Sequence, residues 1–135
     1  MFQINNTYNI FISHSWEYHN DYDKIMTWLR NSNIQIRDYS ISTEKALPLM
    51  SKTALKANIS EKIRHASVVI ILAGMYAAYS DWIDYEIDEA VRMGKPILGV
   101  IPWGQQRIPS KISANSTCMV YWNSESIVKG VKSLL

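Results

Sequence analysis

Residues 68–72 (VVIIL) form an apolar run that contains no polar side chain. A strand with one solvated face alternates apolar and polar residues, whereas a strand buried on both faces is apolar throughout. The second pattern is typical of parallel sheets, because the helices that connect their strands cover both faces. This run therefore predicts the central strand of a parallel sheet.

Apolar segments alternate along the chain with stretches of helical periodicity. Asp21 is expected to cap the first helix, and Ser80 or Asp81 to cap the third, which Gly94 ends. We predict strands at 8–13, 34–37, 68–72, 96–101 and 119–122, and helices at 21–29, 52–64, 80–93 and 124–135.

This alternation implies right-handed crossovers between parallel strands. We predict a three-layer α/β fold, namely a flavodoxin-like five-stranded parallel sheet in the order 2-1-3-4-5 with helices on both faces, as a single domain over residues 1–135. Ligands of such sheets bind beyond the carboxyl ends of the strands, where the strand order reverses. The loops after Ser13, Arg37 and Leu72 then lie together at the carboxyl edge of the sheet. We call this edge the rim, and it is the expected ligand-binding site.

Composition narrows the functional classes. The 135 residues are 47% hydrophobic with a formal net charge of +2, which excludes a disordered chain and predicts no nucleic-acid or membrane partner. The longest apolar run, 68–79, is shorter than the roughly 20 residues that span a bilayer. No targeting segment is visible, so a cytoplasmic protein is expected. Cys118 is the one cysteine, and the histidines have no metal-ligand spacing with it, so no metal is predicted.

Several ligand-binding motifs of parallel sheets are missing from the sequence. Residues 13–17 contain no glycine, which excludes the usual pyrophosphate turn of dinucleotide-binding folds, and there is no Walker motif. Residues 72–74 offer no acidic group of the kind that ends the third strand of a phospho-receiver. Cys118 lies in an apolar strand pattern, which favours an inert thiol over a nucleophile.

Glu86 lies on the apolar side of the third predicted helix. At about 100° per residue it shares an arc with Trp82 and Ile83, while the neighbouring acids Asp84 and Asp88 fall on the opposite side. Burying a carboxylate without partners is costly, so such a group is either paired for structural reasons or retained for chemistry. The helix begins at the predicted rim, and both interpretations of Glu86 stay open at this point.

Four segments, in order, carry a family resemblance: 10–15 (IFISHS), 63–72, 80–87 (SDWIDYEI) and 94–100 (GKPILGV). On the basis of these four segments, the chain resembles a Toll/interleukin-1 receptor (TIR) domain over about residues 8–130. Within that family it is most similar to the bacterial TIR-like proteins of the Thoeris anti-phage system. The W-x-x-x-E spacing from Trp82 to Glu86 matches the motif that carries the catalytic glutamate of NAD-cleaving TIR domains.

The resemblance implies an enzyme that breaks the nicotinamide–ribose bond, with Glu86 as its catalytic residue, NAD as substrate and no cofactor. It further implies that ADP-ribose is cyclised into a diffusible signalling nucleotide, which activates a separate effector during infection. Activation from outside, through self-association or a phage-derived trigger, is expected as well.

Aromatic side chains on the rim can sandwich adenine and nicotinamide, and the candidates are Phe11, Trp16, Tyr39, Tyr76 and Trp82. Each has a structural alternative. Phe11 alternates with isoleucines in a buried strand, and Trp82 suits packing of its helix on the sheet. Trp16 and Tyr39 lie in polar loops, where they can face a ligand or a partner protein.

Polar candidates end the first two strands. Ser13 and His14 can hold phosphate or ribose through backbone N–H groups and the hydroxyl. Arg37 and Asp38 begin the 38–48 loop, which in TIR domains mediates assembly and borders the NAD site. Arg37 can contact a phosphate, or it can form an ordinary surface ion pair.

Two other functions remain as alternatives. A non-catalytic TIR adaptor works only through contacts of the 38–48 loop, but such adaptors typically lack the glutamate that this chain keeps at position 86. A nucleoside deoxyribosyltransferase-like N-glycosidase has a similar sheet and a glutamate nucleophile. It requires further acidic residues around a nucleobase, and the sequence does not locate them.

Overall fold

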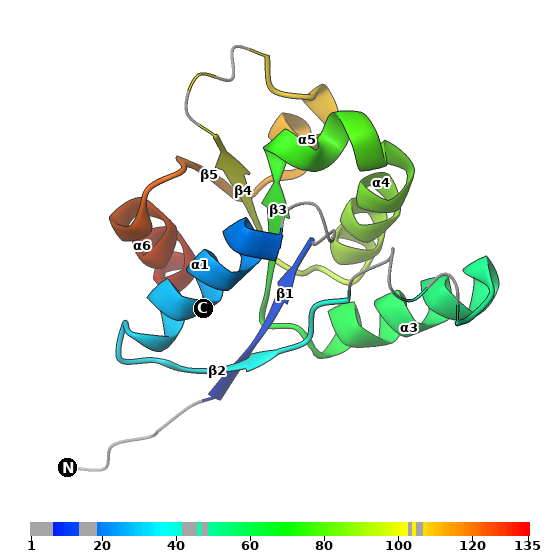
Figure 1. Ribbon diagram of the computed structural model, residues 1–135, viewed down its shortest axis with the longest axis horizontal. Coiled ribbons are helices and arrows are strands. Elements are labelled where there is room, and N and C mark those ends of the chain that lie inside the picture. Colours follow the sequence, from blue (N-terminus) through cyan, green and yellow to red (C-terminus); the bar gives the residue numbers. More distant parts are fainter. Residues whose placement is uncertain (1–6, 14–18, 42–45, 47–48, 103, 105–106) are drawn as a thin grey trace.

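Five strands form one parallel sheet in the order β2-β1-β3-β4-β5, so the predicted fold and strand order are confirmed (Figure 1). The structure is a computed structural model that describes residues 7–13, 19–41, 46, 49–102, 104 and 107–135. The strands are β1 (Thr7–Ile12), β2 (Gln35–Asp38), β3 (Val68–Leu72), β4 (Ile97–Ile101) and β5 (Cys118–Tyr121).

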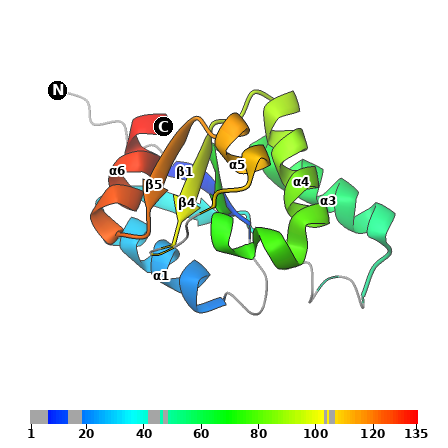
Figure 2. The same cartoon turned by 90° about the horizontal axis from the view of Figure 1, so that it is seen from above.

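Helices cover both faces of the sheet. Two of them, α1 and α6, pack on one face, and α3, α4 and α5 pack on the other (Figure 1, Figure 2). Their bounds are α1 (His19–Arg30), α3 (Lys52–His65), α4 (Tyr76–Arg92), α5 (Ser110–Asn115) and α6 (Ser124–Leu134), and a short 3-10 turn, η2 (Ala73–Met75), joins β3 to α4. Within the described part of the chain, no helix is both long and apolar enough to cross a membrane.

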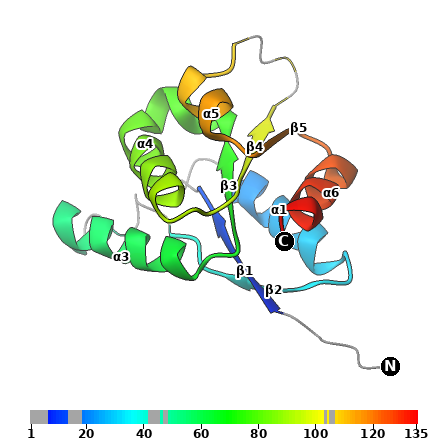
Figure 3. The same ribbon diagram turned by 180° about the vertical axis from the view of Figure 1, so that it is seen from behind.

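The core forms where the apolar runs predict it. All five residues of β3 are buried, as are the five of β4. On α3, Leu55, Ile59 and Ile63 recur every fourth residue and are fully buried. The Ser51 side chain starts this helix by accepting a hydrogen bond from the Ala54 N–H. Burial of these apolar faces fixes α3 beside α4 (Figure 3).

The expected helix starts hold only in part. α4 is counted from Tyr76, but two helical segments meet at a kink at Tyr79 (φ −131°, ψ 29°), and the longer segment begins at Ser80, which is one of the two expected starts. Asp21 lies inside the first turn of α1 and does not cap it, but its negative charge still suits the positive end of the helix.

The helix α5 was not predicted from the sequence. It has six residues, and no side chain caps its start at Pro109. Ile112 is its one buried residue. A helix of this length has too few apolar positions to show a periodic pattern.

Candidate active site

Ser13 and Glu86 meet at the carboxyl edge of the sheet. They are the two buried polar side chains in the described part of the chain, with exposed fractions of 1% and 2%. β1 brings Ser13 there, and its N–H donates to the Ile70 carbonyl oxygen at 2.8 Å, extending the pairing with β3. α4 brings Glu86, and the Ser13 side chain acts on the pKa of its carboxyl group. Periodicity placed Glu86 on the buried face, and that placement is confirmed.

Burial controls the protonation of Glu86. Loss of solvent raises the pKa of its carboxyl group to about 8, against the lowering effect of the Ser13 hydrogen bond. The carboxyl group is therefore largely neutral at pH 7. Its Oε2 atom is buried and has no hydrogen-bond partner among the described residues. This oxygen therefore remains available to a ligand.

Two other acidic residues of α4 have ordinary structural roles, because each forms an ion pair with a basic side chain. Asp88 pairs with Lys111, and Glu89 pairs with Arg92. The hydrogen bond from Arg92 is the main reason why the pKa of Glu89 falls to about 2. Among the described residues, no basic side chain acts on Glu86 in this way. The ion-pair interpretation of Glu86 is thus unsupported.

A hollow lies beside the kink of α4. It has a volume of about 280 Å³ and is lined by Tyr79, Ser80, Asp81 and Trp82. Trp82 is partly buried and packs on the core. Positions four apart in a helix are neighbours on one face, so Trp82 and Glu86 lie one above the other. The hollow therefore adjoins the helical turn that carries the carboxyl group.

The other aromatic candidates have contacts of their own. Phe11 is fully buried in the core, which matches its structural alternative. Tyr76 donates its phenol proton to Asp84, with 2.7 Å between Tyr76 Oη and Asp84 Oδ1. The ring of Tyr39 faces α3, with its centroid 6.1 Å from that of the His65 ring. Their roles in substrate binding stay predictions.

The structure describes only some of the polar candidates. Arg37 and Asp38 are exposed at the end of β2. The Asp38 Oδ1 atom accepts a hydrogen bond from the Ser40 N–H at 2.8 Å, so this carboxylate shapes the turn that follows the strand. His14 and Trp16 lie outside the described residues. The structure brings Ser13 and Glu86 together, and it leaves the binding roles of the others as predictions.

A polar cluster between α3 and α4 was missed at the sequence level. Ser60 donates to Glu89, and the Tyr85 hydroxyl contacts Ser60 and donates to the Lys56 carbonyl oxygen. Tyr85 and Glu89 lie four apart on α4, and this spacing was the available signal. The cluster fixes α4 against α3 and thereby supports the turn that holds Glu86.

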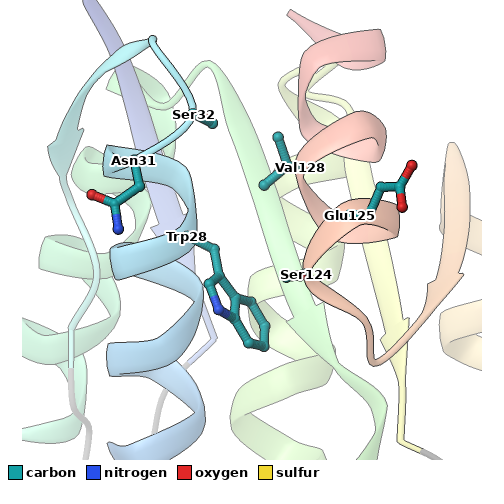
Figure 4. Close-up of a pocket in the computed structure, with 6 residues that line it drawn as sticks. All are labelled: Trp28, Asn31, Ser32, Ser124, Glu125 and Val128. Carbon is teal, nitrogen blue, oxygen red and sulfur yellow. The ribbon is translucent and has the colours of Figure 1, made fainter.

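A second hollow, of about 290 Å³, lies between α1 and α6 and contains none of the candidate residues. Figure 4 shows Trp28 reaching from α1 toward the start of α6. The lining residues are Trp28, Asn31, Ser32, Ser124, Glu125 and Val128. Within the described ranges, no three His, Cys, Asp or Glu side chains come together to hold a metal ion.

Comparison with known proteins gives a family and a fold. The family model described as "Thoeris protein ThsB, TIR-like domain" matches residues 11–107. No curated protein matches the chain. A CMP N-glycosidase from Clostridium botulinum has a similar structure, with a TM-score of 0.59 and 12% identity over 92% of this chain and 98% of that one. A 3-dehydroquinate dehydratase-like protein from Bifidobacterium longum is also similar, with a TM-score of 0.54 and 10% identity over 95% and 94% of the two chains.

Proposed function

Because this chain belongs to the family of Thoeris ThsB TIR-like domains, we propose that it cleaves the nicotinamide–ribose bond of NAD, with Glu86 as the catalytic residue. One observation carries the proposal. Glu86 is a buried carboxyl group at the carboxyl edge of the sheet, and its Oε2 atom has no hydrogen-bond partner among the described residues. A group kept in this costly state is typical of a functional site.

The reaction breaks one C–N bond. The electron pair leaves with the nicotinamide nitrogen, so nicotinamide departs as a neutral molecule and needs no general acid. The ribose carbon is left as an oxocarbenium-like cation. A Glu86 carboxylate beside the ribose stabilises this charge and accepts hydrogen bonds from the ribose hydroxyl groups. Preorganised charge in a poorly hydrated site lowers such a barrier by several kcal/mol.

The carboxyl group changes its protonation during this cycle. With a pKa of about 8 it is largely neutral in the free protein at pH 7. A bound nicotinamide ring carries a positive charge, which favours the carboxylate form. The transition state, in which the charge moves to the ribose, favours it as well. The proposed site thus gains its strongest electrostatic interaction when the substrate is in place.

The fate of the ribosyl cation decides the product. Capture by water gives ADP-ribose, whereas capture by an atom of the adenosine half gives a cyclic nucleotide. Cyclisation requires the dinucleotide to fold back in a site that excludes water. We propose the cyclic product, which acts as a diffusible signal to a separate effector in anti-phage defence. Membership of the Thoeris family supports this role.

Activation is proposed to come from outside the chain, through self-association or a phage-derived trigger. Self-association makes the activity per molecule rise with protein concentration. A phage-derived trigger makes it rise on addition of lysate from infected cells. Activity that responds to neither variable contradicts this part of the proposal.

A second candidate substrate is a nucleotide with a neutral base, such as CMP. The supporting observation is the neutral carboxyl group of Glu86, because a neutral acid can donate a proton to a departing base. The fold that the chain shares with the CMP N-glycosidase makes this substrate class worth testing. In this reaction Glu86 acts as an acid, which is the reverse of its role with NAD.

The experiment incubates the purified chain with NAD or with CMP, alone and with lysate from phage-infected cells, and resolves the products by mass spectrometry. Nicotinamide together with a cyclic or linear ADP-ribose supports the first proposal. Release of cytosine supports the second. If neither substrate is consumed under any condition, the chain is a non-catalytic adaptor.

A further inference from the structure

We propose that Tyr85 is a positioning residue, which fixes the rotation of α4 about its own axis and thereby sets the direction of the Glu86 side chain. It acts through its neighbour in the chain and not through a contact with the substrate. The inference deepens the proposed function and rests on it. The sequence pattern does not mark Tyr85 for this role, because its partners lie on another helix.

The Tyr85 side chain is bound to α3 through both its hydroxyl group and its ring. The hydroxyl donates to the Lys56 carbonyl oxygen at 3.1 Å and is hydrogen-bonded to Ser60 Oγ. Lys56 Nζ lies 5.3 Å from the centroid of the ring, which is a cation–π contact. Lys56 and Ser60 are four positions apart, so they lie on one face of α3. That face therefore holds Tyr85 at both ends of its side chain.

Glu89 joins the next turn of α4 to the same face of α3. Its Oε1 atom accepts a hydrogen bond from Ser60 Oγ. Its Oε2 atom accepts from Arg92 Nε at 2.6 Å, which keeps the carboxylate in place. Tyr85 and Glu89 are four positions apart and lie one above the other on α4. Contacts on two successive turns restrict the rotation of α4 more than a single contact does.

Glu86 follows Tyr85 directly, so the same contacts set its direction. Successive side chains of an α-helix point about 100° apart. With Tyr85 bound to α3, Glu86 faces the interior and is 2% exposed. A rotation of about 10° moves an atom that lies about 5 Å from the helix axis by about 1 Å. A misplacement of about 1 Å can lower the rate of an enzyme by about 100-fold.

Two other polar contacts of α4 are less suited to this task. Asp88 pairs with Lys111 of α5, but the Asp88 side chain is 63% exposed, and exposed ion pairs contribute little. Asp84 accepts a hydrogen bond from Tyr76, which belongs to α4 itself. That bond constrains the kink and does not join α4 to a neighbouring element. The hydroxyl contact of Tyr85 is partly buried and reaches a second helix.

The first test needs no substrate. The carboxyl carbon of Glu86 is titrated by NMR in the wild-type protein, in Tyr85→Phe and in Ser133→Ala. Burial raises the pKa of Glu86 to about 8. A rotated helix admits water to the carboxyl group, so the midpoint in Tyr85→Phe should fall by about half a pH unit or more. Ser133→Ala is the control, because Ser133 Oγ donates to the Gly130 carbonyl oxygen within α6. A midpoint in Tyr85→Phe equal to that of Ser133→Ala overturns the inference.

The second test uses NAD turnover. Tyr85→Phe and Ser60→Ala should each lower kcat by about tenfold or more with little change in KM, because a catalytic group is displaced and no substrate contact is lost. Ser60→Thr keeps a hydroxyl group and should retain the wild-type kcat, as should Ser133→Ala. A raised KM with unchanged kcat in Tyr85→Phe overturns the inference. If the wild-type protein cleaves no NAD at all, the proposed function fails, and the titration alone still decides whether Tyr85 positions Glu86.

Discussion

Tyr76 and Asp84 are joined by a hydrogen bond that spans the kink of α4, with 2.7 Å between Tyr76 Oη and Asp84 Oδ1. The two residues are eight positions apart, which corresponds to a rise of about 12 Å in a straight helix. The non-helical backbone at Tyr79 allows the contact. The bond therefore helps to set the direction of the helical segment that carries Glu86.

Replacement of Tyr76 by phenylalanine should weaken this arrangement. Tyr76→Phe removes the donor and leaves the half-buried Asp84 without it, so the free energy of unfolding should fall by about 1–2 kcal/mol. Asp84→Asn keeps an acceptor oxygen and should retain most of the stability. Urea denaturation measures both variants. Equal midpoints for Tyr76→Phe and the wild-type protein show that the bond does not stabilise the kink.

Glu86 should make the stability of the fold depend on pH. The pKa of its carboxyl group is about 8 in the folded protein, against an ordinary value of 4.5 for a glutamate in water. Between these values the folded state binds more protons than the unfolded state, so stability falls as pH rises and levels off above about 8. Glu86→Gln removes this dependence. The variant should match the wild-type protein near pH 4 and be more stable above pH 8 by a few kcal/mol.

Thermal unfolding of both proteins across this pH range provides the measurement. Asp88→Asn is the control, because Asp88 is an exposed acid of the same helix that pairs with Lys111 at the surface. A constant difference between Glu86→Gln and the wild-type protein at all pH values contradicts the assignment of the slope to Glu86.

The pH dependence of activity distinguishes NAD from CMP as the substrate, because the two reactions require opposite protonation states of Glu86. Cleavage of NAD requires the carboxylate, so kcat/KM should rise with pH through a midpoint near 8. Cleavage of CMP requires the neutral acid, so kcat/KM should fall through the same midpoint. Initial rates from pH 6 to pH 9 give the sign of the slope. A flat NAD profile over that range is incompatible with the carboxylate mechanism.

Gly99 in β4 leaves room for α5. A Cβ atom at this position would lie 2.7 Å from Ser116 Oγ and 3.3 Å from Ile112 Cγ2. Ser116 Oγ already donates to the Ile112 carbonyl oxygen at 2.6 Å, so it cannot move away without cost. Gly99→Ala should therefore destabilise the fold by about 1–3 kcal/mol. The exposed Lys132→Ala on α6 should change stability by less than about 0.5 kcal/mol. Calorimetric melting temperatures compare the two.

The sequence predicts those parts of the fold that depend on local pattern. Apolar runs correctly place β3 and β4. The i, i+4 spacing of Leu55, Ile59 and Ile63 correctly places α3. The helical turn before the kink, which begins at Tyr76, is not predicted, because the Tyr76–Asp84 bond that supports it forms across the kink.

For the candidate site, periodicity is sufficient to place Glu86 on the buried face of α4. It cannot show that Ser13 acts on the pKa of this carboxyl group, because β1 and α4 come together only in the folded sheet. The contacts of Tyr39 with His65 and Lys62 are tertiary for the same reason. Sequence alone indicates that a residue is buried, and the structure is needed to name what it touches.

Release of nicotinamide from NAD by Glu86→Gln, compared with Asp88→Asn, is the most direct test of the proposed chemistry. Both variants remove one carboxyl group from α4, but Asp88 is exposed and paired with Lys111. We expect Glu86→Gln to remain folded and to lose nicotinamide release, and Asp88→Asn to retain it. Undiminished release by folded Glu86→Gln would contradict the catalytic role of this carboxyl group.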